Sequence, residues 1–423
     1  MSVASFVEDF RLTGPARLAP IRRAAIERFS ALGFPTPRDE DWHFTNVREI
    51  ADTRWTPVAA GHIQADDLLP FTFGSDWTLM VFVNGRFAPA LSSLSGLPAR
   101  VRVTQLVDNE RLTTLAPIDV AFTALNTAFM TDGALIQIPA DVVLEHPIHL
   151  LYVTDSETAA HGVTYPRTLI LAGRHSHATI VESYVAVGDA VYFTNAVTEV
   201  DVAEGAHIAH YRVQRESDRA YHVGTTEVRQ ARDSRYHSFS FATGATLARV
   251  NVYDVLGGQG GEATLDGLYL ADGTQHIDHQ TRIEHVAPNC ASREVYKGVM
   301  DGAAHGVFNG KVYVHPEAQK TDGKQTNNNL LLSDRAHADT KPQLEIFADD
   351  VKCTHGATVG RLDEVALFYL KSRGISADAA RTLLTYAFAA DVLQRIDDTT
   401  VRTALEALLL ERFVGTTEAV ATV

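Results

Sequence analysis

The chain has 423 residues, of which 45% are hydrophobic and 21% charged, a composition typical of a folded globular protein with two or three domains. Its 52 acidic and 37 basic side chains give a net charge of −15, which argues against nucleic acid or anionic lipid as partners because such a surface repels phosphate groups. No uncharged apolar stretch reaches the ~18–20 residues that a membrane span needs. Only Cys290 and Cys353 are present, and early charges do not suit a signal peptide, so we expect reduced thiols and a cytoplasmic location.

Residues 1–133 form a predicted helical or mixed N-terminal domain. Between residues 16 and 32, apolar side chains recur at spacings of three and four, and Gly33 follows as a helix stop. Residues 77–83 are a short apolar run followed by Asn84-Gly85, which predicts a strand and a hairpin turn. A further helix is predicted over residues 118–130.

Residues 134–358 form a predicted all-β domain. Short β-branched and aromatic runs alternate there with Gly, Asp, Asn and His, often every 8–14 residues. A weak repeat of Ala-x-aliphatic followed by Tyr starts at Ala178, Ala206 and Ala263, which are 28 and 57 residues apart. A period near 28 residues suits one coil of a β-solenoid, which we favour over a large β-sandwich.

Residues 359–423 form a predicted helical C-terminal domain. Asp363 and Ser376 are predicted N-caps of two helices, the second ending near residue 396, and a third helix is predicted over residues 400–413.

The second of these helices is apolar around most of its circumference. One stripe contains Phe388, and another contains Tyr386 and Leu393. A helix of this kind needs cover on both sides. Either the β domain or another protein can supply that cover, and the residues do not decide between them.

The sequence lacks the motifs of common enzyme classes. It has no complete phosphate-binding loop and no Gly-x-Ser-x-Gly nucleophile motif. Asp278 and Glu284 could serve glycoside chemistry, but acidic residues on strands are more often solvated. His276, His279 and His285 are expected to form a polar surface on one coil.

Cys353 and His355 form the most distinctive pair. In an extended segment, residues two apart point to the same side, so the thiol and the imidazole lie side by side. Such a pair suits a thiophilic metal or an activated cysteine nucleophile, but it equally suits a buried cysteine beside a hydrogen-bonded histidine. An iron–sulfur cluster typically needs four thiolates, so a cluster here requires ligands from a second chain.

Several segments of the chain are distinctive when they are taken together. They are Glu-Asp-Trp-His-Phe-Thr (40–45), His-Ile-Asp-His (276–279), Arg-Glu-Val-Tyr-Lys-Gly-Val-Met (293–300), Gln-Thr-Asn-Asn-Asn (325–329), Lys-Pro-Gln-Leu-Glu-Ile (341–346) and Asp-Asp-Val-Lys-Cys-Thr-His-Gly (349–356). With these segments the chain resembles the SufD family of the SUF (SufBCD) iron–sulfur cluster assembly machinery. The two cysteines, and the Lys-Cys-Thr-His-Gly text at residues 352–356, match SufD better than its longer, cysteine-richer sister SufB.

The resemblance implies a mainly β fold, with a right-handed parallel β-helix between helical terminal domains. It implies a non-catalytic scaffold with a role in iron acquisition, which pairs with SufB through the β-helix ends and binds the SufC ATPase through its C-terminal helices. We expect Tyr386, Phe388 and Leu393 to contact SufC. A nascent iron–sulfur cluster shared with SufB is expected at His355 and Cys353. A reduced flavin has been linked to such complexes.

Two alternatives remain open on the sequence. One is a homodimeric β-solenoid interaction protein without cluster chemistry, and the other is a β-solenoid carbohydrate-active enzyme. Co-purification with an ATPase and a cysteine-rich paralogue would separate the scaffold from both.

Overall fold

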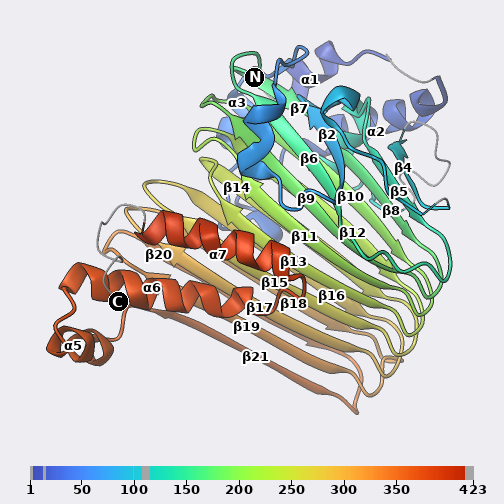
Figure 1. Cartoon of the computed structure of the whole chain (residues 1–423). Coiled ribbons are helices and arrows are strands. Elements are labelled where there is room, and N and C mark those ends of the chain that lie inside the picture. Colours follow the sequence, from blue (N-terminus) through green and yellow to red (C-terminus); the bar gives the residue numbers. More distant parts are fainter. Residues whose placement is uncertain (1–2, 13–15, 99, 107–114, 415–423) are drawn as a thin grey trace.

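The computed structural model describes residues 3–12, 16–98, 100–106 and 115–414. Its centre is a parallel β-helix of about 7 turns, in which each coil contributes one strand to each of two sheets (Figure 1). The predicted solenoid is therefore confirmed, and the β-sandwich alternative is wrong.

The first sheet, called sheet 1, contains the even-numbered strands from β8 to β20 together with four shorter strands that precede them or lie beside them. Its order is β20-β18-β16-β14-β12-β10-β8-β5-β4; the short strand β7 also pairs with β10, and β1 pairs with β7. The bounds are β1 (Thr56–Pro57), β4 (Arg102–Gln105), β5 (Ala134–Ile138), β7 (Gly162–Thr164), β8 (Arg167–Ala172), β10 (Phe193–Val202), β12 (Tyr221–Gln230), β14 (Leu247–Leu256), β16 (His276–His285), β18 (His305–Val314) and β20 (His337–Ile346).

The second sheet, called sheet 2, has the order β21-β19-β17-β15-β13-β11-β9-β6-β2-β3. Its bounds are β2 (Thr78–Val83), β3 (Arg86–Phe87), β6 (Ile148–Asp155), β9 (His177–Val187), β11 (His207–Arg215), β13 (Arg235–Thr243), β15 (Glu262–Ala271), β17 (Ala291–Met300), β19 (Asp322–Leu331) and β21 (Lys352–Gly360). The predicted hairpin at Asn84-Gly85 joins β2 and β3.

The repeat found in the sequence has the right period but a partly wrong alignment. The register pairs His207 with Arg235, 28 residues later, which agrees with the predicted coil length. It pairs Ala178 with Ile208 rather than with Ala206, so the first two copies are two residues out of step. The coil from β9 to β11 is therefore two residues longer than the coil from β11 to β13. The spacing of similar residues in the sequence does not by itself reveal such an insertion.

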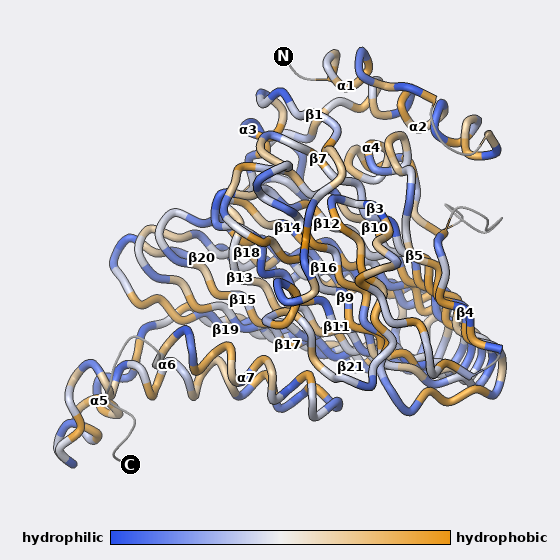
Figure 2. The backbone as a smooth tube through the Cα atoms, turned by 45° about the horizontal axis from the view of Figure 1, so that its top comes forward, coloured by the Kyte–Doolittle hydropathy of each residue, from blue (hydrophilic) through white to orange (hydrophobic). Residues whose placement is uncertain are grey.

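Helices of the N-terminal region cover the outer face of sheet 1 (Figure 2). Phe29, Trp42 and Phe122 pack there against Phe193 and Val223. The predicted helices at residues 16–32 and 118–130 are both present. The elements are α1 (Val3–Asp9), η1 (Ala16–Leu18), α2 (Ala19–Leu32), η2 (Glu40–Trp42), α3 (Arg48–Asp52), η3 (Ala65–Phe71), η4 (Pro89–Leu91) and α4 (Ala121–Phe129).

Three C-terminal helices follow the solenoid: α5 (Glu364–Ser372), α6 (Ala377–Leu393) and α7 (Thr399–Val414). Asp363 and Ser376 cap α5 and α6 as predicted, since their side chains accept hydrogen bonds from backbone N–H groups of the first turn. Helices α6 and α7 cover the outer face of sheet 2, where they pack against Leu268 and Val299. The cover that α6 needs is therefore supplied by this chain itself.

Within the described residues, no helix combines the length and the hydropathy required to cross a membrane.

Candidate functional site

The last coil of the solenoid leaves two strand edges open. In the described part of the chain, β20 pairs only with β18 and β21 pairs only with β19. Every residue of β21 except Cys353 is exposed, although most residues of the equivalent strands β15 and β17 inside the stack are buried. An unprotected edge of this length is a template for pairing with another strand.

The backbone groups that remain unpaired on β21 follow from its register. The N–H of Lys352 donates to the carbonyl of Thr321 at 2.8 Å. In a parallel ladder, alternate residues bond to one neighbour, so the residues between them turn their N–H and C=O groups to the other side. The backbone groups of Cys353, His355 and Ala357 therefore face the open edge.

Cys353 and His355 point from β21 towards the interior of the solenoid at its open end. The Cys353 side chain is half-buried and packs against Val312, Val314 and Ala318 of the preceding coil. Burial raises the pKa of the Cys353 thiol, which makes it a poor thiolate in the chain alone. His355 is exposed because no further coil covers it.

The layer beneath this pair is polar. His355 is paired in the ladder with Gln325, which is buried and whose Nε2 donates to Glu294 Oε2 at 2.5 Å. Burial raises the pKa of the Glu294 carboxyl to about 7. Among the described residues, β21 thus turns one thiol and one imidazole towards the solenoid interior, an incomplete ligand set for a four-thiolate cluster.

Cys290, the other cysteine, lies apart from this pair. It is buried in the solenoid core, whereas Cys353 packs in the last coil, and both thiols are free. Burial raises the pKa of the Cys290 thiol as well.

The three residues expected to contact SufC lie on α6 and differ in accessibility. Leu393 is fully buried in the cluster that joins α6 and α7 to sheet 2. Tyr386 and Phe388 are half-buried, and Lys297 Nζ lies 4.7 Å from the centroid of the Phe388 ring.

Helix α5 offers a larger apolar surface, which the sequence reasoning missed. Val365, Phe368 and Tyr369 are 75%, 71% and 57% exposed. Their spacing of three and four places them on one side of the helix, and that spacing was the available signal. Figure 1 shows α5 beyond the end of α6, projecting from the body of the solenoid.

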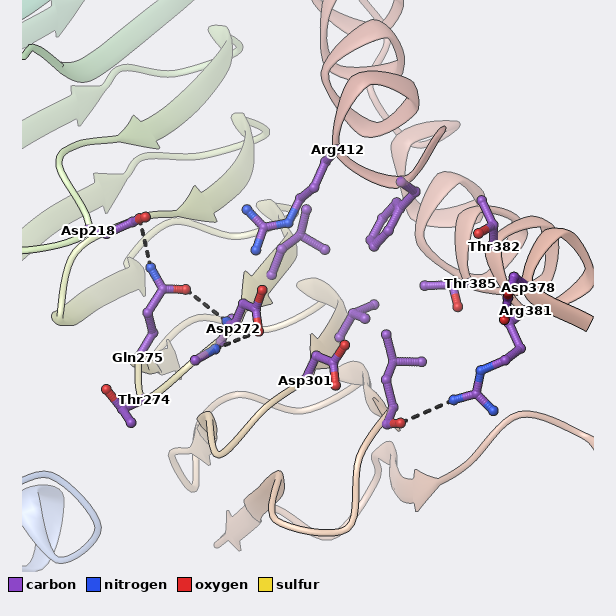
Figure 3. Close-up of a pocket in the computed structure, with 16 residues that line it drawn as sticks. Asp218, Asp272, Thr274, Gln275, Asp301, Asp378, Arg381, Thr382, Thr385 and Arg412 are labelled. Atoms are coloured by element: carbon purple, nitrogen blue, oxygen red, sulfur yellow. Dashed lines mark hydrogen bonds between the residues drawn. The ribbon is translucent and has the colours of Figure 1, made fainter. Parts of the chain in front are cut away.

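A cavity of about 740 Å³ lies between the C-terminal helices and the solenoid loops (Figure 3). Asp218, Asp272 and Asp301 approach it from the loops, while Arg381 and Arg412 approach it from α6 and α7. Its described lining contains no His, Cys, Ser, Tyr or Lys side chain. The opposed charges suit a hydrated contact between the helices and the coils.

The two carboxylates considered for glycoside chemistry are both engaged in the structure. Asp278 is fully buried and accepts hydrogen bonds from Thr45 at 2.5 Å and Arg249 at 2.7 Å. Glu284 pairs with Arg282 and His315, each at 2.7 Å.

The expectation of one polar histidine surface at residues 276–285 is wrong. His279 and His285 lie inside the solenoid, where they contact Ser240 and Ser292, and burial lowers the pKa of both rings to about 4. His276 lies on the outer face. Odd spacing along a strand separates His276 from the other two.

Comparison with known proteins gives matches over most of the chain. The family model described as "SUF system FeS cluster assembly, SufBD core domain" matches residues 152–388, and "SufBD protein N-terminal region" matches residues 12–150. The iron–sulfur cluster assembly protein SufD of Escherichia coli K12 is 33% identical over 411 residues, covering 96% of this chain and 95% of the relative. The SufBD family protein slr0076 of Synechocystis is 35% identical over 395 residues, covering 89% and 86%. SufD of Bacillus subtilis is 28% identical over 407 residues, covering 90% and 91%.

Proposed function

Because this chain belongs to the SufBD family, which serves SUF iron–sulfur cluster assembly, we propose that it is a SufD-type scaffold subunit rather than an enzyme. The observation that carries this proposal is the open end of the solenoid, where an unpaired strand edge and an incomplete ligand set occur together. A nascent cluster is then cargo that the assembled complex builds and hands on.

The partner at the open end is a SufB-type subunit. Strand addition at β21 would use the outward N–H and C=O groups of Cys353, His355 and Ala357, and the same contact would bury His355. Thiolates from the partner would complete the ligand set to which Cys353 and His355 contribute. A positive charge from bound iron would favour the Cys353 thiolate, which this chain alone disfavours.

The partner at the C-terminal helices is a SufC-type ATPase. The exposed side of α5, formed by Val365, Phe368 and Tyr369, supports this part of the proposal, and the half-buried Tyr386 and Phe388 extend it along α6. Leu393 would act indirectly by holding α6 on sheet 2. The role in iron acquisition, the cytosolic location and the reduced flavin stay predictions.

The proposal is tested by anaerobic co-expression with SufB and SufC, followed by iron and sulfide counts per intact complex. His355→Ala and Cys353→Ala should each lower the iron content, while complex yield persists. Thr354→Ala is the matched control, since Thr354 is also exposed on β21 but points to the opposite side.

Unchanged iron and sulfide in both variants would remove this pair from the assembly site. A homodimeric interaction protein without cluster chemistry predicts that result, together with self-association and no capture of SufB. A loss of thermal stability in His355→Ala that accompanies normal iron per intact complex would assign the histidine a structural role.

A further inference from the structure

Three side chains able to bind a metal meet on the outer face of sheet 1. His305 and His337 are the first residues of β18 and β20, and the strand register pairs them directly. Asp339 lies two residues further along β20 and therefore on the same face. One ligand atom from each side chain lies within 4.8 Å of the others, and the described residues contain no second group of three like it. Cys353 and His355 lie apart from this group because they face the solenoid interior.

The group is held by regular structure rather than by a loop. His305 Nε2 lies 2.8 Å from Asp339 Oδ2, and the rings of His305 and His337 stack with centroids 3.9 Å apart. Because the ladder between β18 and β20 fixes both backbones, the three side chains stay close whether or not an ion is present. Sites built on strands are positioned more accurately than sites on loops.

A second layer of hydrogen bonds orients His305. Its Nδ1 lies 3.1 Å from His276 Nδ1, and His276 Nε2 lies 2.8 Å from Thr45 Oγ1. Thr45 donates to the fully buried Asp278, which also accepts from Arg249. Metal-binding histidines commonly use their second ring nitrogen in this way, to fix the tautomer and the ring orientation.

We propose that His305, His337 and Asp339 bind one divalent first-row transition-metal ion, such as Fe²⁺ or Zn²⁺, with water in the remaining positions. Two imidazoles and one carboxylate are the ligand set of open iron(II) sites and of several zinc sites. Binding requires the His337 ring to turn out of its stack so that a nitrogen points at the ion. His337 is exposed, so this rotation is unobstructed and solvent can deliver the metal.

The test uses the isolated full chain, with Co²⁺ as a spectroscopic probe and Zn²⁺ and anaerobic Fe²⁺ in calorimetric titrations. The wild type should bind one ion per chain. His337→Ala and Asp339→Asn should each weaken binding by at least ~10-fold, since even second-layer changes typically cost 10–100-fold. Melting temperatures recorded in parallel verify that the variants are folded.

Two controls make the result decisive. His146 lies 3.1 Å from Asp76 on the surface but belongs to no group of three, so His146→Ala should bind as the wild type does. The double variant Cys353→Ala/His355→Ala should also retain the ion. Absence of stoichiometric binding, or binding that survives in both His337→Ala and Asp339→Asn, would overturn the assignment. Such a failure would leave the proposed scaffold role intact, because that role rests on Cys353 and His355 of β21 and not on the outer face of sheet 1.

Discussion

Replacing Asp254 by asparagine should remove a fall in stability that this carboxyl imposes as the pH rises. Asp254 lies on β14 and is fully buried, with the Gln230 amide Nε2 at 3.3 and 3.2 Å from its two oxygens. Burial, with a smaller contribution from the nearby Glu294, raises the pKa of this carboxyl to about 8. An unfolded aspartate has a pKa near 3.9.

The sign follows from proton uptake. Between about pH 4 and pH 8 the native state keeps a proton that the unfolded chain has released, so raising the pH favours unfolding. The contribution of the protonated Asp254 carboxyl to stability is fully present below the pKa of the unfolded chain. It is lost as the pH rises through the pKa of the native state. Each pH unit in this window changes the free energy of unfolding by about 1.4 kcal/mol, or roughly 3 kcal/mol between pH 5 and pH 7.

Asparagine has nearly the same shape as aspartic acid and cannot ionise. The difference in melting temperature between wild type and Asp254→Asn should therefore change by a few degrees between pH 5 and pH 7, with the variant gaining at the higher pH. Calorimetric melts at pH 5, 6, 7 and 8 measure it, with the exposed Asp349→Asn as a control for removing one charge. A difference that stays constant over this range would refute the reasoning, because it would mean that the native carboxyl is already ionised.

Three further predictions follow from the edge, the helices and the core. Ala357→Pro removes an N–H group that faces the open edge and should weaken capture of SufB by ~10-fold or more. Thr358→Pro instead breaks a backbone hydrogen bond to β19 and should unfold the last coil. Gel filtration of the co-expressed chains measures the first effect, and melting curves measure the second. Phe368→Asp should abolish co-purification of SufC, and stoichiometric SufC on this variant would contradict the α5 surface. Glu199→Gln leaves the fully buried Arg167 guanidinium without its ion pair and should cost about 3–5 kcal/mol, so a thermal shift near zero would be incompatible with that pair.

Local features of this fold could be predicted from the sequence because local chemistry determines them. The caps at Asp363 and Ser376 depend on one side chain and the first turn of a helix, and both are present. The turn at Asn84-Gly85 and the 28-residue coil between β11 and β13 are equally short-range.

Features that depend on neighbouring coils were not predictable. His305 and His337 are 32 residues apart and share no motif, yet the ladder places their rings in contact. In the same way, the composition of α6 did not indicate that sheet 2 covers it, and the shorter α5 carries the exposed aromatic side chains instead.

The chemistry of the open end comes from its position in the stack more than from unusual residues. One coil earlier, the ladder positions of Cys353 and His355 are occupied by Gly323 and Gln325, and both are buried because β21 covers them. A further coil would bury Cys353 and His355 in the same way and would satisfy the edge of β21. A paired subunit that supplies such a coil therefore shields the site from solvent as it completes the ligand set, so assembly of the complex and closure of the cluster site become one event. A scaffold built in this way exposes its ligands only while it lacks a partner.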